Sequence, residues 1–439
     1  MSLNLTPTGD RIHIGIFGKR NAGKSSLINA ITDQKIAIVS HIKGTTTDPV
    51  QKAMELPPLG PVVIIDTPGL DDTKELGELR IQKAIQVLNK TDIALLVVDI
   101  ALGISKEDLQ ILKVIQKKKI PHVIVFNKVD LLERLNEGCE KEEQQAGRAK
   151  GRENAHHSLS DGKPELINTR TCIVSAKTGK NIKKLKELIG NLLPEKAAKV
   201  PLVRDLVTPG DNVILVVPID EAAPKGRLIL PQQQVIRDLL EGEAGAMVVK
   251  ETQLEGALRS LNKAPALVIT DSQIFEEVNE VVPSELLLTS FSILFARAKG
   301  VLEDAVEGAY ALKGLKTGDK VLISEGCTHH RQCNDIGTVK LPRWIQEYTG
   351  QTLDFEFTSG TEFPHELSKY SCIVHCGGCM ISEREMKWRC SLAKEQNVPF
   401  TNYGITIAMI HGILERSIQP MVEFNKNLKS LRSMICVVR

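Results

Sequence analysis

The pattern of hydrophobic and polar positions divides the N-terminal part of the chain into alternating strands and helices. Short apolar runs, typical of buried strands, occur at 11–17, 61–65, 93–99, 122–126 and 172–174. Apolar residues at helical spacing occur at 25–32 and 105–116. Strands that alternate with helices in this way predict a parallel sheet covered by helices.

The alternation resumes after Pro194 and a short stretch that we expect to be a linker. A second segment contains strands and helices expected at 213–217, 232–241, 246–249 and 254–261. A third contains elements expected at 266–270, 285–298, 320–324, 342–349, 354–357, 371–374, 399–401 and 405–414. We therefore expect an α/β protein with three domains, at 8–196, 203–263 and 264–439. The polar stretch 138–165 is expected to be a surface insertion and is assigned no role.

A glycine-rich motif follows the first strand and opens the first helix. Residues 18–25 read Gly-Lys-Arg-Asn-Ala-Gly-Lys-Ser. A strand before and a helix after this sequence are the context that a phosphate-binding P-loop requires. Lys24 is expected to reach the β- and γ-phosphate oxygens, and Ser25 to offer its hydroxyl group to Mg²⁺. The other residues expected to contact the nucleotide here are Gly18, Asn21, Ala22, Gly23 and Ser26.

Three later motifs identify the nucleotide. Asp66-Thr-Pro-Gly69 follows a strand, which places Asp66 near Mg²⁺ and the N–H of Gly69 near the γ-phosphate. Asn127-Lys128-Val-Asp130 follows another strand, and the carboxylate of Asp130 can accept hydrogen bonds from N1 and N2 of guanine. Adenine cannot match that pattern, and a buried unpaired carboxylate would reject ATP. The order of these motifs predicts a GTP-binding domain.

The last motif of the domain is Ser175-Ala176-Lys177, where the N–H of Ala176 can meet O6 of guanine. With it, the domain resembles the translation-factor-like GTPases, especially the Era and MnmE group. The sequence Gly44-Thr-Thr-Thr-Asp48 is similar to switch I of that group, and Thr46 matches its Mg²⁺-contacting threonine. Asn21 matches the asparagine that supports K⁺ in some members. The resemblance thus implies catalytic roles for Lys24, Asn21 and Thr46.

The residue after Gly69 is Leu70, so no glutamine stands where Ras-like enzymes orient water. We therefore expect slow GTP hydrolysis, stimulated by K⁺. We expect GTP hydrolysis to change the order of the switch segments and thereby to move domains.

Composition and charge limit the other classes of function. Lys plus Arg is 56 and Asp plus Glu is 54, for a net charge of +2, so a nucleic-acid partner is not expected. No long uncharged apolar run is present and the first residues lack the features of a signal peptide. We therefore expect a cytoplasmic protein without a membrane partner, whose nine cysteines are thiols rather than disulfides.

The cysteines are concentrated near the C-terminus, since only Cys139 and Cys172 precede residue 327. Cys327-Thr-His329 and His375-Cys376-Gly-Gly-Cys379 each follow an expected strand, where open α/β sheets build their sites. Three thiolates with an exchangeable fourth partner suit an iron–sulfur cluster. Three thiolates with one histidine suit structural zinc equally well. The residues alone leave both alternatives open.

This pair of motifs behind a GTPase domain resembles the HydF family of FeFe-hydrogenase maturation GTPases. The resemblance implies that Cys327, Cys376 and Cys379 bind a 4Fe–4S cluster, with His329, His375, another residue or solvent at the fourth position. It implies a second domain for dimerisation and a third for cluster binding. It also implies a homodimeric or larger scaffold that receives a diiron precursor from two radical-SAM maturases and delivers it to the apo-hydrogenase.

Two other functions compete with this interpretation. The first is a ribosome- or tRNA-associated GTPase with a structural zinc site, against which the near-neutral charge counts. The second is a redox protein whose cluster senses electrons and gates GTP hydrolysis.

Overall fold

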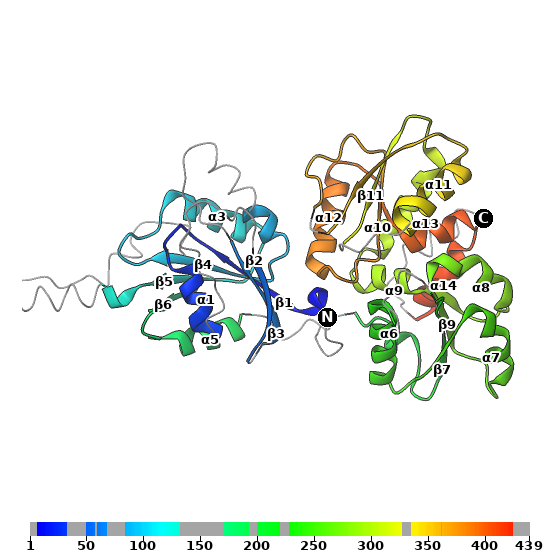
Figure 1. The fold of residues 1–439 in the computed structure, drawn as a ribbon, viewed down its shortest axis with the longest axis horizontal. Helices are drawn as coiled ribbons and strands as arrows, with labels where there is room; N and C mark the ends of the chain where they lie inside the picture. The colour runs from blue at the N-terminus through cyan, green and yellow to red at the C-terminus, as the bar shows by residue number, and fades with distance from the viewer. Residues whose placement is uncertain are drawn as a thin grey trace, which may run out of the picture. The chain divides into compact units, whose positions relative to one another are not determined.

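The computed structural model describes residues 7–32, 50–57, 59–67, 84–131, 170–192, 200–219, 228–326, 335–360 and 362–424. They belong to two compact units, residues 1–197 and 198–439. Strands alternate with helices in both units, which confirms the predicted α/β class (Figure 1). None of the described helices is long and apolar enough to cross a membrane.

The first unit contains a six-stranded sheet. Its strands are β1 (Ile12–Phe17), β2 (Val50–Leu56), β3 (Gly60–Asp66), β4 (Ile93–Asp99), β5 (His122–Asn127) and β6 (Arg170–Ile173). Their order is β2-β3-β1-β4-β5-β6, and only β2 runs antiparallel to its neighbour. β2 was not predicted, because Gln51, Lys52 and Glu55 interrupt its apolar residues.

Helices cover both faces of this sheet. They are α1 (Lys24–Thr32), α3 (Lys106–Lys117) and α5 (Ile182–Gly190), preceded by the short 3-10 helix Thr8–Asp10. Along β4, Leu95 and Val97 pack into the apolar cluster that contains α1 and α5, whereas Leu96 and Val98 pack into the cluster that contains α3. The alternation of side chains along a strand thus sends every second residue to the opposite layer.

The second unit contains two four-stranded parallel sheets. The first has the order β10-β9-β7-β8, with β7 (Asn212–Val216), β8 (Gly245–Val249), β9 (Leu267–Thr270) and β10 (Leu288–Ser290). The second has the order β12-β11-β13-β14, with β11 (Lys320–Ser324), β12 (Asp354–Thr358), β13 (Cys372–His375) and β14 (Phe400–Asn402).

Helices surround both sheets of this unit (Figure 1). The α-helices are α6 (Leu230–Glu241), α7 (Leu254–Ser260), α8 (Phe275–Val281), α9 (Phe291–Ala298), α10 (Leu302–Tyr310), α11 (Leu341–Thr349), α12 (Glu383–Glu395), α13 (Tyr403–Ile410) and α14 (Leu414–Phe424). Short 3-10 helices occur at Arg204–Leu206, Glu251–Gln253, Ser272–Ile274 and Ala311–Gly314, and a π-helix at Ile336–Lys340.

The two sheets of the second unit share one apolar core, which extends from Val203 to Val422. The boundary between the second and third domains is expected after residue 263, but β9 and β10 follow that residue and belong to the sheet of β7. β10 also replaces the start of the helix expected at 285–298. Its residues are fully buried, and a short buried strand cannot be told from a buried helical turn by periodicity alone.

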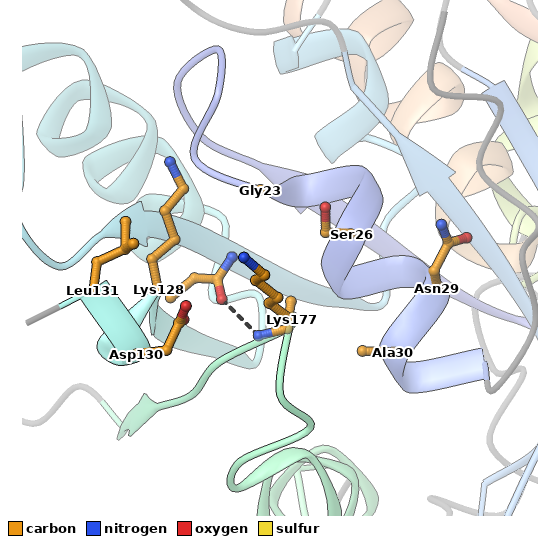
Figure 2. A pocket seen from close by; sticks show the side chains of 10 residues that line it. Gly23, Ser26, Asn29, Ala30, Lys128, Asp130, Leu131 and Lys177 are labelled. Atoms are coloured by element: carbon orange, nitrogen blue, oxygen red, sulfur yellow. Dashed lines mark hydrogen bonds between the residues drawn. The ribbon is translucent and has the colours of Figure 1, made fainter. Parts of the chain in front are cut away.

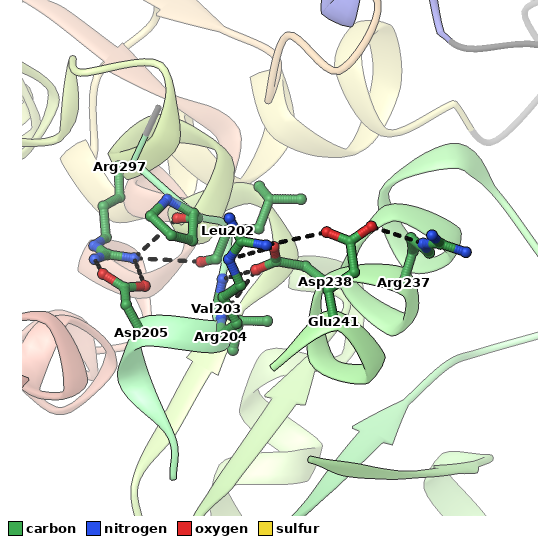
Figure 3. Close-up of polar contacts among 9 residues, drawn as sticks. Leu202, Val203, Arg204, Asp205, Arg237, Asp238, Glu241 and Arg297 are labelled. Atoms are coloured by element: carbon green, nitrogen blue, oxygen red, sulfur yellow. Dashed lines mark hydrogen bonds and ion pairs between the residues drawn. The ribbon is translucent and has the colours of Figure 1, made fainter. Parts of the chain in front are cut away.

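Hydrogen bonds from Arg297 and to Asp238 hold residues 201–205, at the start of the second unit, in place (Figure 3). Arg297 of α9 is buried and donates hydrogen bonds to Asp205 Oδ1 at 3.0 Å and to the carbonyl oxygen of Pro201 at 3.1 Å. Asp238 of α6 accepts the backbone N–H of Val203 at 2.7 Å. The segment 201–205 is therefore fixed to α9 at one side and to α6 at the other.

Candidate functional site

The strands of the first unit collect the nucleotide motifs at one edge of the sheet. Register pairs Ile16 of β1 with Asp66 of β3, and Asp99 of β4 with Asn127 of β5. These strands are parallel, so their carboxyl ends meet at the same edge, where open α/β sheets bind ligands. Motifs far apart in the sequence are thereby brought together.

The loop between β1 and α1 needs glycine at two positions. Gly18 has φ +137°, and a Cβ atom there would lie 2.1 Å from the carbonyl oxygen of Val97. Gly23 has φ +90°, and a Cβ atom there would lie 2.3 Å from Nδ2 of Asn127. Asn21 has φ 61° and is exposed at the tip of the loop. The close packing explains why the motif has glycine where it does.

Lys24 is the first residue of α1, and its side chain folds back into this loop. Its buried Nζ donates to the carbonyl oxygens of Gly18 at 2.9 Å and Lys19 at 2.8 Å. These bonds hold the ammonium group within the loop, where it can attract the phosphates of a nucleotide.

Ser25 and Asp66 form the part of the site that fits Mg²⁺. Ser25 Oγ donates to Asp66 Oδ2 at 3.2 Å. Asp66 Oδ1 is buried and has no hydrogen-bond partner among the described residues. Burial raises the pKa of the Asp66 carboxyl group, and the charge of Lys24 lowers that pKa in part. A hydroxyl oxygen beside a buried, unpartnered carboxylate oxygen is a donor set that a hard cation prefers. Thr46 and Gly69, also expected here, lie outside the described residues.

Asn127 connects the phosphate loop to the loop after β6. Its Nδ2 donates to the carbonyl oxygen of Ala22 at 3.0 Å, and its Oδ1 accepts the N–H of Ala176 at 3.0 Å. Asp130 is also buried, and its Oδ1 accepts the hydroxyl group of Ser175 at 2.6 Å. The groups expected to recognise guanine are thus held by each other.

A pocket of about 670 Å³ lies between these loops and α1 (Figure 2). Its lining includes Asn29, Ala30 and Leu131, which no motif predicted. Asn29 and Ala30 follow Ser26 by three and four residues, so helical spacing from the motif could have found them. The other lining residues are all predicted ones: Gly23, Ser26, Asn127, Lys128, Asp130, Ala176 and Lys177. Among them, Lys128 pairs its Nζ with Asp99 Oδ2 at 2.7 Å.

The second candidate site is the loop that follows β13. Cys376 Sγ accepts the N–H of Gly326 at 3.0 Å and the N–H of Gly378 at 3.4 Å. Gly326 immediately precedes Cys327 in the chain and lies just beyond the end of β11, which pairs with β13. The first cysteine of the Cys-x2-Cys motif therefore bonds to the residue next to Cys327.

The described residues do not complete a metal site. Among them, no group of three or more His, Cys, Asp or Glu side chains could hold a metal ion. Cys327 and His329 lie outside the described residues, while Cys376 and Cys379 are half-buried in the loop. Cys372 and Cys390 are buried as expected of core residues, and burial is the main cause that raises the pKa of each thiol to about 12.

His375 is one of the residues expected as a possible fourth ligand. Its ring is fully buried, with Nδ1 2.8 Å from the carbonyl oxygen of Cys376 and Nε2 3.0 Å from Nη1 of Arg389. An imidazole needs a nitrogen lone pair to bind a metal, and both nitrogens of His375 have other partners here. In the described structure both ring nitrogens of His375 are therefore engaged with protein groups.

The same loop lies at the N-terminal ends of two helices. A Cβ atom on Gly377 would be 3.4 Å from Oγ of Ser292, the second residue of α9. Ser292 Oγ accepts the N–H of Gly404, the second residue of α13, at 3.3 Å. Helix N-termini carry partial positive charge, which favours nearby anionic thiolates.

Comparison with known proteins agrees with the class that the first site defines. Residues 13–128 match the family model described as 50S ribosome-binding GTPase. The tRNA modification GTPase MnmE of Carboxydothermus hydrogenoformans is 44% identical over 119 residues, which are 27% of this chain and 25% of that protein. GTPase Der of Kosmotoga olearia is 38% identical over 128 residues, 28% and 29% of the two chains. The first unit is a P-loop GTPase domain.

The similarities to MnmE and Der are confined to part of each protein. The chain spans about a quarter of the length of the curated relatives that it matches. The solved structure of Aquifex aeolicus Era is 21% identical and covers 57% of this chain and 98% of that chain, with a TM-score of 0.31.

Two further family models match the second unit. Residues 202–300 match the hydrogen maturase F dimerization domain, and residues 303–420 match the hydrogen maturase F tetramerization domain. Together with the GTPase domain, these matches identify the whole chain. It belongs to the hydrogen maturase F (HydF) family, as the resemblance of its sequence motifs predicts.

Proposed function

We propose that this protein is a GTP-hydrolysing scaffold for the maturation of FeFe-hydrogenase. In this proposal Cys327, Cys376 and Cys379 bind a 4Fe–4S cluster. The protein receives a diiron precursor from two radical-SAM maturases and delivers it to the apo-hydrogenase in the cytoplasm. The family membership supports the maturation role. The observation that carries the cluster site is the bond from the N–H of Gly326 to Cys376 Sγ.

The bond from Gly326 to Cys376 brings the residue that precedes Cys327 into contact with the Cys-x2-Cys motif, which is about 50 residues away in the sequence. Ser324, the last residue of β11, is in register with His375, the last residue of β13. The two strands therefore end side by side, and each is followed directly by a cysteine motif. Backbone N–H groups that point at sulfur, together with the nearby helix N-termini, stabilise thiolates, which are the form of cysteine that ligates iron.

The GTPase domain would regulate the exchange of partners rather than perform iron chemistry. Lys24, Ser25 and Asp66 would hold the phosphates and Mg²⁺, which neutralises charge that develops on the phosphates. Asn127, Asp130 and Ala176 would select guanine. Because Leu70 occupies the position of the water-orienting glutamine, we propose slow turnover that K⁺ stimulates through Asn21.

Assembly into homo-oligomers is part of the proposal. The two family models in the second unit are named for dimerization and tetramerization, which supports a homodimer that associates further. A nucleic-acid partner is not part of this proposal.

Anaerobic reconstitution with iron and sulfide tests the cluster. We expect about four iron atoms per chain and, after reduction with dithionite, an EPR signal of a 4Fe–4S cluster. The signal should change when imidazole or cyanide is added, because the fourth position is exchangeable. Cys390→Ala, which removes a buried thiol away from the loop, should retain the signal. Tight binding of one zinc ion without iron uptake would instead favour a ribosome- or tRNA-associated GTPase.

A further inference from the structure

A network of buried polar side chains lies directly behind the Cys-x2-Cys loop. His375 stands between the loop and α12, with Nδ1 2.8 Å from the carbonyl oxygen of Cys376 and Nε2 3.0 Å from Arg389 Nη1. Arginine only donates, so Nε2 accepts and the proton of the neutral ring is on Nδ1. His375 therefore donates to the carbonyl group of Cys376 and accepts from Arg389.

Arg389 has no exposed surface, and both of its Nη atoms have hydrogen-bond partners. Its Nη2 donates to Glu385 Oε1 at 2.5 Å and to the carbonyl oxygen of Gly360 at 3.0 Å. The guanidinium group also lies 5.0 Å from the ring centroid of Phe363. Glu385 is buried as well, so the ion pair is enclosed within the protein. A planar guanidinium can span three such partners at once, whereas an ammonium group cannot.

A buried ion pair of this kind is weak evidence for stability, because the loss of solvation offsets much of the attraction. Its best attested benefit is to fix one arrangement of the groups around it. Here the arrangement that it fixes is the orientation of His375 and, through it, the backbone at Cys376. An ion pair at this spacing on α12 does not require burial, since Glu383 and Lys387 form an exposed pair on the same helix.

We propose that Arg389 is a positioning residue of the cysteine site: it holds His375 on the carbonyl group of Cys376, so that His375 orients the Cys-x2-Cys loop and does not bind the metal. This inference rests on the proposed cluster at that loop. It assigns the histidine next to the first cysteine of the motif a structural task. The fourth metal position is then left to another residue or to an exogenous ligand.

The experiment compares wild type with Arg389→Lys after anaerobic reconstitution. Lysine keeps the charge opposite Glu385 but loses the fork that reaches His375. We expect a lower unfolding midpoint, because the buried acceptors of His375 and Gly360 lose their donor. We also expect cluster loss to an iron chelator that is roughly tenfold faster, as for the loss of one buried hydrogen bond, and a new ¹⁴N coupling from His375 in pulsed EPR. Glu383→Leu/Lys387→Met, the exposed pair on α12, is the control and should match wild type in all three measurements.

Two further variants keep the test decisive. Glu385→Leu/Arg389→Met removes both buried charges, and should reproduce the faster cluster loss if Arg389→Lys fails to fold. His375→Asn keeps an N–H donor near the position of Nδ1, and should leave the ¹⁴N spectrum of wild type unchanged.

A strong ¹⁴N coupling in wild type that disappears in His375→Asn would show that His375 is a ligand and would overturn the inference. Equal rates of cluster loss in wild type, Arg389→Lys and the double variant would overturn it as well. If wild type takes up no iron at all, that result contradicts the proposed function itself, and the proposed role of Arg389 is excluded as well.

Discussion

The nucleotide site and the cysteine site both lie at the carboxyl ends of parallel strands, yet they are held in different ways. In the nucleotide site the motif side chains bond to each other or to motif backbone, as in the pairs Asp130–Ser175 and Asn127–Ala176. In the cysteine site, Cys376 Sγ bonds to the backbone of Gly326 and Gly378.

Apart from His375, the side chains that support the cysteine loop belong to no motif. Arg389 and Glu385 are on α12, and Ser292 is on α9. In the nucleotide site, the residues expected to bind the base are held in place by other residues of the nucleotide motifs. A thiolate site needs a surrounding shell. Here its members come both from α12, which follows the loop directly in the chain, and from α9, which precedes it by about 80 residues.

Reactivity of the thiols gives the largest expected contrast. Burial is the main cause that raises the pKa of the Cys372 and Cys390 thiols to about 12. At pH 8 only about one such thiol in 10,000 is therefore the reactive thiolate. Iodoacetamide should label them about a thousandfold more slowly than an ordinary exposed cysteine, and the rate should rise about tenfold per pH unit. Mass spectrometry of the apo-protein measures both. Rapid labelling of Cys372 at pH 8 would contradict the burial.

Independence of the two sites is the next prediction. Lys24→Ala removes the ammonium group from the phosphate loop and should slow GTP turnover by about 100- to 1,000-fold, while iron content is unchanged. Cys376→Ala should abolish cluster binding and leave GTP turnover within about twofold, because the two sites are in separate units. Turnover assays and iron analysis on both variants measure this. Loss of both properties in either variant would show that the sites depend on each other.

Base recognition should show an effect of about 100-fold. Asp130→Asn replaces an acceptor by an amide that can donate, so affinity for GTP should fall by about that factor and affinity for XTP should rise. Ser175→Ala, which leaves the carboxylate but removes its 2.6 Å hydrogen bond, should cost about tenfold or less. Binding titrations with both nucleotides decide the point. An unchanged preference for GTP in Asp130→Asn would remove Asp130 from the guanine site.

The smallest effect concerns the monovalent cation. Replacement of Na⁺ by K⁺ should raise GTP turnover several-fold in wild type, through the exposed Asn21 at the tip of the phosphate loop. Asn21→Ala should lose this difference and keep the rate that wild type has in Na⁺. Identical wild-type rates in the two salts would exclude the role of Asn21.

Most of the first unit could be predicted from its sequence because its signals are local. Each motif directly follows a buried strand, and the rule that parallel strands end together is enough to gather Lys24, Asp66, Asn127 and Ala176. β2 escaped prediction because Gln51, Lys52 and Glu55 leave neither a continuous apolar run nor a strict alternation of polar and apolar residues. Asn29 and Ala30 escaped it because they carry no motif and contribute only their position on α1.

The second unit shows where sequence patterns are insufficient. Arg389 and Glu385, four residues apart on a helix, have the spacing of an ordinary surface ion pair, and nothing in the pattern indicates that both are buried. His375 stands next to a Cys-x2-Cys motif and was therefore considered as a ligand. Only the tertiary structure, which places Arg389 against its ring, distinguishes a ligand from a support.

The anchoring of residues 201–205 has a mechanical consequence. Arg297, near the C-terminal end of α9, bonds to Asp205. Ser292, near the N-terminal end of the same helix, lies beside Gly377 of the cysteine loop. Five residues of helix span only about 7–8 Å. A displacement of residues 201–205 that moves α9 would therefore also displace Ser292, which lies beside Gly377 in the cysteine loop.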